Sequence, residues 1–85
     1  MAKVVIYSTA YCPYCDLAKN LLTAKNVAFT EIRVDLDDVM RDEMMRRSGR
    51  RTVPQIFINE QSIGGYDDLA MLEKSGTLNK LLNDE

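Results

Sequence analysis

Residues 3 to 15 read K-V-V-I-Y-S-T-A-Y-C-P-Y-C and join a short apolar run to the two cysteines of the chain. The run from Val4 to Tyr7 is β-branched and aromatic, which is typical of a buried strand. Residues 9–11 interrupt it, and Pro13 then begins a helical pattern, because proline is favoured in the first turn of a helix. The pattern therefore places Cys12 and Cys15 between a first strand and a first helix.

The whole chain predicts eight elements in the order β-α-β-α-β-β-α-α. Strands are expected over residues 3–8, 28–34, 55–59 and 61–63, and helices over about 13–25, 38–47, 67–74 and 77–82. A strand, a crossover helix and a second strand imply a parallel pair with a right-handed crossover. The tight turn at Asn59-Glu60 implies an antiparallel hairpin, so we expect one mixed sheet with helices on both faces.

Length and composition restrict the class of protein. The 85 residues are enough for one domain, spanning 1–85, with one modest core. The net charge of −2 gives no general attraction to nucleic acid or to an anionic membrane. No apolar run approaches the roughly 18 residues that span a bilayer, and the N-terminus does not resemble a signal peptide. We therefore expect a cytoplasmic protein, without nucleic-acid or membrane partners, whose thiols are mostly kept reduced.

The cysteine pair admits several interpretations. Structural zinc needs four ligands, and this chain has two Cys and no His, so no metal site is expected. A structural disulfide between residues three positions apart closes a very small loop, and the stabilisation grows with loop size. Inert buried thiols are a third interpretation, and a redox-active pair is the fourth.

The placement of the pair favours redox chemistry. Cys12 occupies the N-cap position of the predicted helix, so unpaired N–H groups and the positive end of the helix dipole point toward its sulfur. Both features favour the thiolate over the thiol, as in other Cys-x-x-C motifs. Cys15 lies one turn further into the helix, near enough to attack a mixed disulfide on Cys12. We therefore interpret Cys12 as the nucleophile and Cys15 as the resolving thiol.

Three segments together resemble the glutaredoxin family. They are C-P-Y-C at 12–15, T-V-P at 52–54 and G-G-Y-D-D-L at 64–69. The resemblance covers essentially the whole chain and is closest to a short bacterial dithiol type. It implies a thioredoxin-like α/β fold, a four-stranded mixed sheet flanked by helices. It also implies glutathione as co-substrate, with no tightly bound cofactor.

The T-V-P segment has two interpretations. From the residues alone, Pro54 is an ordinary trans proline at the start of an edge strand. The resemblance instead implies a cis Val53–Pro54 bond facing the cysteines, next to Thr52. The Val53 backbone would then face outward, where glutathione could pair with it as an added strand does. Tyr14 is expected to form a wall of the same site.

The G-G-Y-D-D segment places free backbone N–H groups at a helix start, which suits a carboxylate. By resemblance, Gly65, Tyr66 and Asp67 bind the γ-glutamyl group of glutathione. The N–H groups take its α-carboxylate, and the Asp67 side chain accepts from its ammonium group. The simpler interpretation is a turn with an Asp N-cap, and both can hold at once.

Four arginines precede the T-V-P segment. We expect Arg46 and Arg47 to form a solvated helix end, since cations suit a helix C-terminus. Arg50 and Arg51 admit both interpretations equally: part of the solvated helix end, or cations that attract glutathione, a net anion. We take Arg51 as the site residue. Many glutaredoxins have a lysine three residues before the first cysteine, where this chain has Thr9, and an arginine of this pair is the candidate substitute.

The expected activity is glutathione-dependent thiol–disulfide exchange. Cys12 alone would reduce protein–glutathione mixed disulfides, and Cys12 with Cys15 would reduce protein disulfides. The resemblance implies partners such as ribonucleotide reductase, and we expect a monomer. Two alternatives stay open. One is a redoxin reduced by thioredoxin reductase, against which the G-G-Y-D-D segment argues. The other is a dimeric [2Fe–2S] carrier, against which Pro13 and Cys15 argue.

Overall fold

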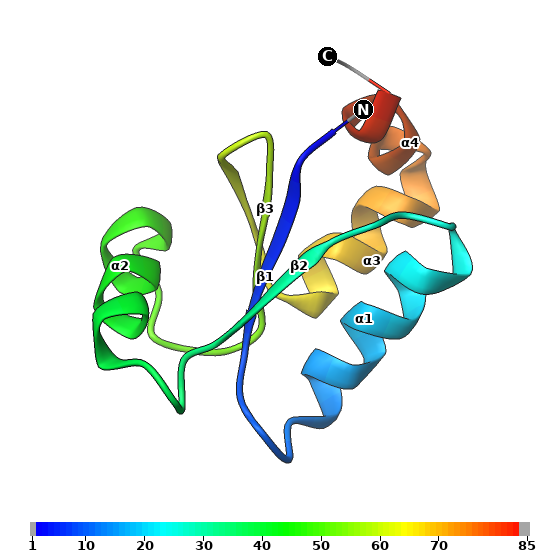
Figure 1. The fold of residues 1–85 in the computed structure, drawn as a ribbon. Helices are drawn as coiled ribbons and strands as arrows, with labels where there is room; N and C mark the ends of the chain where they lie inside the picture. Colours follow the sequence, from blue (N-terminus) through cyan, green and yellow to red (C-terminus); the bar gives the residue numbers. More distant parts are fainter. Residues whose placement is uncertain (1, 84–85) are drawn as a thin grey trace.

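The computed structural model describes residues 2–83, which form four strands and four helices (Figure 1). The strands are β1 (Val4–Ser8), β2 (Thr30–Arg33), β3 (Gln55–Ile58) and β4 (Gln61–Gly64). The helices are α1 (Pro13–Ala24), α2 (Asp38–Ser48), α3 (Tyr66–Ser75) and α4 (Thr77–Asn83). This is the order that the sequence predicts, with small differences at the ends of elements. No helix within residues 2–83 has the length and apolar character needed to cross a membrane.

The four strands form one mixed sheet in the order β2-β1-β3-β4. Strand β1 is parallel to β2 and antiparallel to β3, and β3 is antiparallel to β4. The predicted parallel pair and the predicted hairpin are therefore confirmed. Because β1 and β2 run in the same direction, the segments that follow them lie at the same end of the sheet. The β1–α1 loop lies at this end, opposite the start of β1 and the end of α4 (Figure 1).

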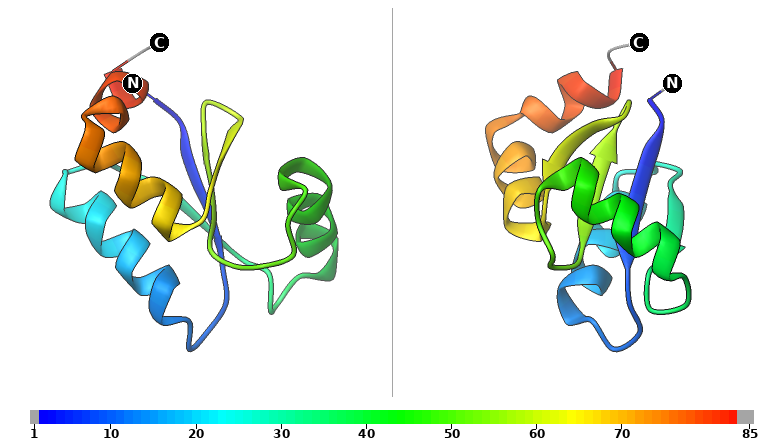
Figure 2. Two further views of the ribbon diagram at one scale, coloured as in Figure 1. Left: turned by 180° about the vertical axis from the view of Figure 1, so that it is seen from behind. Right: turned by 90° about the vertical axis from the view of Figure 1, so that its left-hand side faces the viewer.

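Helices cover both faces of the sheet. Helix α2 lies on one face, and α1 and α3 lie on the other, as Figures 1 and 2 show. Side chains alternate between the faces along each strand, which produces two apolar clusters. The cluster on the side of α1 and α3 contains Val4, Ile6, Ala18, Leu22, Ile56, Ile58, Leu69 and Leu78. The cluster on the side of α2 contains Tyr7, Val34, Met44 and Phe57.

Local signals explain most element boundaries. Asp37 caps α2, because its side chain accepts from the Met40 N–H at 3.1 Å. Gly49 ends the helix in the left-handed conformation, with φ of 73°.

The length predicted for the second strand, residues 28–34, was too long. Strand β2 is a short, largely exposed edge strand of four residues rather than the seven of 28–34.

Candidate functional site

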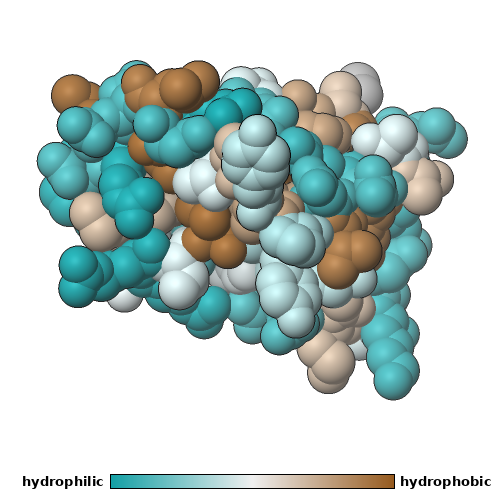
Figure 3. Space-filling model, turned by 90° about the horizontal axis from the view of Figure 1, so that it is seen from below, coloured by the Kyte–Doolittle hydropathy of each residue, from teal (hydrophilic) through white to brown (hydrophobic). Residues whose placement is uncertain are grey.

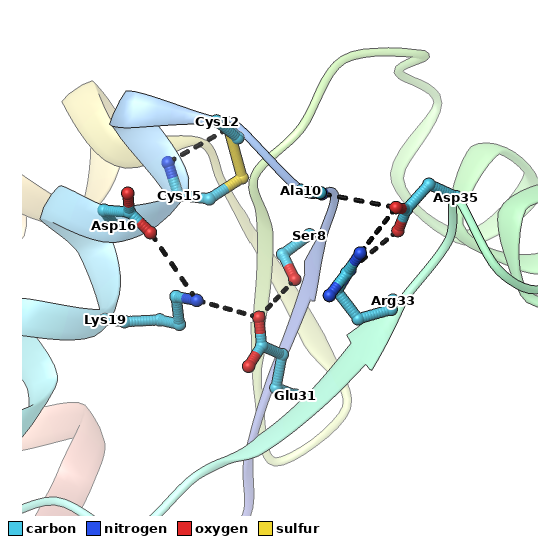
Figure 4. A network of polar contacts seen from close by, with 9 residues as sticks. All are labelled: Ser8, Ala10, Cys12, Cys15, Asp16, Lys19, Glu31, Arg33 and Asp35. Atoms are coloured by element: carbon cyan, nitrogen blue, oxygen red, sulfur yellow. Dashed lines mark hydrogen bonds and ion pairs between the residues drawn. A yellow bond between two sulfur atoms is a disulfide. The ribbon is translucent and has the colours of Figure 1, made fainter.

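The cysteine pair lies at the start of α1, as the sequence predicts. Cys12 is the N-cap residue, and Pro13 occupies the first helical turn. The Cys15 backbone N–H donates to the Cys12 sulfur at 3.1 Å. The two sulfurs form a disulfide (Figure 4), with 5.1 Å between the Cα atoms.

The two cysteines differ in their environment. Cys15 is fully buried, whereas Cys12 is partly exposed. An attacking sulfur must be accessible, and a sulfur that accepts a helix N–H bond is stabilised as thiolate. The burial and the hydrogen bond therefore agree with Cys12 as the nucleophile and Cys15 as the resolving thiol.

A network of polar side chains connects α1, β1 and β2 below the cysteines (Figure 4). Ser8 donates to Glu31 at 2.6 Å, and Lys19 donates to Glu31 at 2.9 Å. Lys19 also lies 3.6 Å from Asp16. The Ser8 hydroxyl and, second, the Lys19 ammonium lower the pKa of Glu31 below its usual range. The hydrogen bond to Glu31 is in turn the main cause that raises the pKa of Lys19.

The loop before Cys12 is attached to the end of β2. The Ala10 N–H donates to Asp35 at 3.4 Å, and Arg33 binds the same carboxylate with two hydrogen bonds of 2.7 and 2.6 Å. The Arg33 guanidinium is the main cause that lowers the pKa of Asp35 to about 2. Tyr11 follows with φ of 56°, in the left-handed region, and its side chain is fully exposed. The parallel pairing of β1 with β2 thus determines where the loop holds Cys12.

A cavity of about 210 Å³ combines most of the predicted glutathione residues. Its lining consists of Tyr14, Arg50, Thr52, Val53, Pro54, Gly65, Tyr66, Asp67 and Asp68. We call this cavity the cleft. A larger cavity of about 370 Å³ contains no residue that the sequence predicts for the site; it is lined by Ala2, Lys25, Asn26, Val27, Ala28, Asn79, Leu82 and Asn83. The lining of the cleft includes Tyr14 of the C-P-Y-C segment, so the cleft is the candidate binding site for the chemistry of Cys12.

The T-V-P loop forms one side of the cleft. The Val53–Pro54 peptide bond is cis, as the resemblance implies. Within residues 2–83 no hydrogen bond engages the Val53 backbone. Tyr14 from α1 lies near Tyr66 from α3, with 6.1 Å between the ring centroids. The two rings thus connect the start of α1, where the cysteines lie, to the start of α3.

The start of α3 forms the other side of the cleft. Gly65 is the N-cap residue, and its N–H donates to the Asp68 carboxylate at 3.0 Å. The simpler expectation of an Asp N-cap is therefore wrong, because the capping carboxylate is at the third helical position instead. The Gly65 N–H and, second, Arg50 lower the pKa of Asp68 below its usual range.

The structure distinguishes the arginines that the sequence left nearly equal. Both arginines are exposed, but Arg50 lines the cleft and donates to Asp68 at 2.9 Å, whereas Arg51 is not part of the lining. Sequence reasoning missed Asp68 as a cleft residue, although its spacing from Gly65 matches a capping box. Arg47 is not simply solvated, because its guanidinium lies 4.6 Å from the Phe57 ring centroid.

The surface around the cysteines carries exposed apolar side chains. Seen from the end where the β1–α1 loop lies, hydrophobic areas are separated by hydrophilic atoms (Figure 3). The exposed large side chains of this loop, of α1 and of the segment around the start of α2 are Tyr11, Tyr14, Leu17, Leu36 and Val39.

Across residues 2–83 no group of three or more Cys, His, Asp or Glu side chains could hold a metal ion.

Known proteins resemble this chain over most of its length. The glutaredoxin family model matches residues 4–63. Glutaredoxin 3 of Escherichia coli K12 is 54% identical over 82 residues, which cover 96% of this chain and 99% of that protein. A Pseudomonas aeruginosa glutaredoxin is 52% identical over 83 residues, covering 98% of this chain and 99% of the relative.

A solved structure agrees with the fold as well. The buckwheat glutaredoxin–glutathione complex superposes with a TM-score of 0.90 at 29% identity, covering 98% of this chain and 78% of that one. The thioredoxin-like fold that the resemblance implies is therefore confirmed. With its Cys12–Cys15 pair at the start of α1, the chain belongs to the glutaredoxin family and is a thiol–disulfide oxidoreductase.

Proposed function

We propose that this protein uses glutathione to reduce glutathionylated proteins and protein disulfides. The observation that carries the proposal is the cleft between the cis Val53–Pro54 loop and the start of α3, near Cys12. Such a cleft offers a peptide backbone to one part of a small peptide and helix N–H groups to its carboxylate. The buckwheat structure, a glutathione complex of a related fold, supports the same ligand class.

The cleft suits the γ-glutamyl group at the start of α3. The Gly65 N–H is already bound by Asp68, so the N–H groups of Tyr66 and Asp67 are the candidates for the α-carboxylate. The Asp67 side chain would accept from the ammonium group. Thr52 and Val53 would pair with the middle of the tripeptide, and Tyr14 would form a wall. Arg51 stays a predicted contributor, and Arg50 joins it as a cation inside the cleft.

The monothiol reaction has two exchange steps. The Cys12 thiolate attacks the glutathione sulfur of a mixed disulfide, so a Cys12–glutathione disulfide forms and the protein thiolate leaves and takes up a proton. A second glutathione thiolate then attacks the bound glutathione sulfur. This step releases oxidised glutathione and regenerates the Cys12 thiolate. The rates depend on the pKa values of the attacking and leaving thiols.

The dithiol reaction uses the second cysteine. Cys12 attacks a protein disulfide, and Cys15 then attacks the Cys12 sulfur of the mixed disulfide, releasing the reduced protein. The product is the Cys12–Cys15 disulfide, the state found in the structure. Two glutathione molecules reduce this bond and leave as oxidised glutathione.

The test is a coupled assay with glutathione reductase and a glutathionylated peptide. We expect Cys12→Ser to lose activity by about a thousandfold or more, because the nucleophile is removed. Cys15→Ser should keep most of its activity on the same peptide. An equal loss in both variants would contradict the assignment of roles.

The same assay separates the alternatives. Turnover that requires thioredoxin reductase and proceeds without glutathione would support the redoxin hypothesis instead. A brown protein after anaerobic purification would support the [2Fe–2S] carrier. We expect neither result, because the residues of the cleft suit glutathione and the chain has the second thiol, Cys15, of a dithiol enzyme.

A further inference from the structure

Gln55, the first residue of β3, has an unusual environment for a long amide side chain. It is fully buried, directly after the cleft residue Pro54, and it is opposite Tyr7 in the sheet. Its Nε2 group donates to the Thr52 carbonyl at 3.0 Å and lies 3.4 Å from the Thr52 hydroxyl. Its Oε1 atom is buried without a hydrogen-bond partner, the one such side-chain atom found in residues 2–83.

The contact with Thr52 determines which end of the amide faces the loop. A carbonyl oxygen accepts hydrogen bonds and cannot donate them, so the group 3.0 Å from the Thr52 carbonyl must be the NH₂ end. The opposite orientation would place two acceptors together. The donor end is therefore occupied by the loop, and the acceptor end is the one without a partner.

This arrangement is unfavourable for the fold alone. A buried acceptor without a partner loses its bonds to water and gains none in return. A methionine has a similar length and would fill the same space without this loss. The amide therefore stabilises the fold no better than an apolar side chain of similar size would. What the amide adds is a hydrogen bond that fixes the Thr52 carbonyl, and with it the Thr52–Val53 segment, beside the cleft.

We propose that Gln55 is a positioning residue that holds the Thr52–Val53 backbone in the orientation that pairs with glutathione. The inference rests on the proposed function, because it assigns a role within the same cleft. Gln55 does not line the cleft and acts through Thr52. It therefore affects glutathione binding and leaves the reactivity of the Cys12 sulfur unchanged.

The test compares Gln55→Met with the wild type in the coupled assay on a glutathionylated peptide. We expect KM to rise about fivefold, the size of one net hydrogen bond, and kcat to change less than about twofold. The rate at which iodoacetamide alkylates Cys12, measured in a Cys15→Ser background, should not change. The melting temperature should fall by no more than about 5 °C, because the unpaired oxygen is removed together with the bond to Thr52.

Two controls make the comparison specific. Gln61→Met makes the same chemical change at the exposed first residue of β4, and we expect wild-type KM and kcat. Gln55→Leu is a second apolar variant in case methionine does not fold, and it should raise KM like Gln55→Met. An unchanged KM in both Gln55 variants would overturn the inference. A parallel fall in melting temperature, kcat and alkylation rate would also overturn it, because it would indicate a purely structural role.

Backbone order parameters from ¹⁵N relaxation test the positioning without any substrate. In Gln55→Met the order parameters of the Thr52 and Val53 amides should be lower than in the wild type, whereas those of β1 should not change. Unchanged order parameters at both positions would overturn the inference even if KM rose. If the wild type does not use the glutathionylated peptide, the proposed function fails, and the relaxation result still decides whether Gln55 holds the loop.

Discussion

Asp68 joins both sides of the cleft through one carboxylate oxygen. Its Oδ2 atom accepts from the Gly65 N–H at 3.0 Å and from Arg50 at 2.9 Å. Sequence reasoning selected Asp67 instead, because both aspartates are at the same helix start. Successive residues on a helix point about 100° apart, so only the third helical position returns toward the N-cap N–H.

We predict that Asp68→Ala lowers the free energy of unfolding by about 0.5–2 kcal/mol at pH 7, the usual value of a helix cap. The pKa of Asp68 is lowered from its ordinary value of 3.8. The stabilisation is therefore fully present above about pH 4 and is lost as the pH falls through the folded-state pKa. Urea unfolding at pH 7 and at pH 2.5 measures this difference.

Asp67→Ala is the matched control, since Asp67 is in the same helical turn without this bond. It should lose less stability than Asp68→Ala at pH 7. Equal losses would mean that the charge near the helix dipole, rather than the cap, stabilises α3.

At the scale of elements, the junction of β4 with α3 depends on a glycine. Gly64 has φ of 110°, and a Cβ atom added to it would contact the Asp68 carboxylate and lie 3.1 Å from an Arg50 nitrogen. Gly49, which ends α2, also has a positive φ, of 73°, but a Cβ there meets nothing within 4 Å. Substituting each glycine by alanine therefore separates the cost of a positive φ, which both positions share, from the cost of a steric clash, which occurs only at Gly64.

We predict that Gly49→Ala costs about 1 kcal/mol of stability, the penalty of a left-handed alanine. Gly64→Ala should cost about 2–4 kcal/mol, because strain and displacement of Asp68 are added. Thermal unfolding of the two variants measures the difference. Similar costs would show that the Asp68 side chain moves aside freely.

Helix α2 packs against the rest of the fold through fewer fully buried side chains than α1 does. Its one fully buried residue is Met44, whereas α1 buries Cys15, Ala18 and Leu22. Elements with few buried apolar contacts open at lower free energy. We predict that the amides of α2 have protection factors about tenfold or more below those of α1, in hydrogen exchange followed by NMR. Equal protection would mean that the fold opens only as one unit.

At the scale of the molecule, three carboxylates make the fold sensitive to acid. The pKa values of Glu31, Asp35 and Asp68 are all lowered, chiefly by the Ser8 hydroxyl, the Arg33 guanidinium and the Gly65 N–H respectively. Each group is ionised more readily in the folded state, so its contribution is present above the unfolded pKa of 4.5 or 3.8.

We predict that the urea midpoint is nearly constant from pH 7 to pH 5 and falls steadily between about pH 4.5 and pH 2. Circular dichroism in a urea titration at each pH measures the midpoint. Asp35→Asn should flatten the most acidic part of the curve, where the pKa of about 2 applies. A midpoint that stays constant to pH 2.5 would contradict the prediction.

The amino-acid sequence predicts the features that depend on local chemistry. The order of eight elements and the unequal cysteines depend on neighbours within a few residues. Examples are Pro13 at the helix start and Gly49 at the helix end, whereas the sequence offered Asp37 and Asp38 equally as the cap of α2. The cis Val53–Pro54 bond was available only through the resemblance, because the residues alone favour the trans form.

Which distant side chains come into contact depends on the packing of the whole fold. The pairing of β1 with β3, with Tyr7 opposite Gln55, brings the Thr52–Pro54 loop beside the loop that precedes Cys12. The pairing of β3 with β4 places the same loop next to the start of α3, in a cleft that Arg50 lines and Arg51 does not. The unpaired oxygen of Gln55 likewise depends on what covers β3. These contacts join residues far apart in the chain, and spacing within one segment carries no information about them.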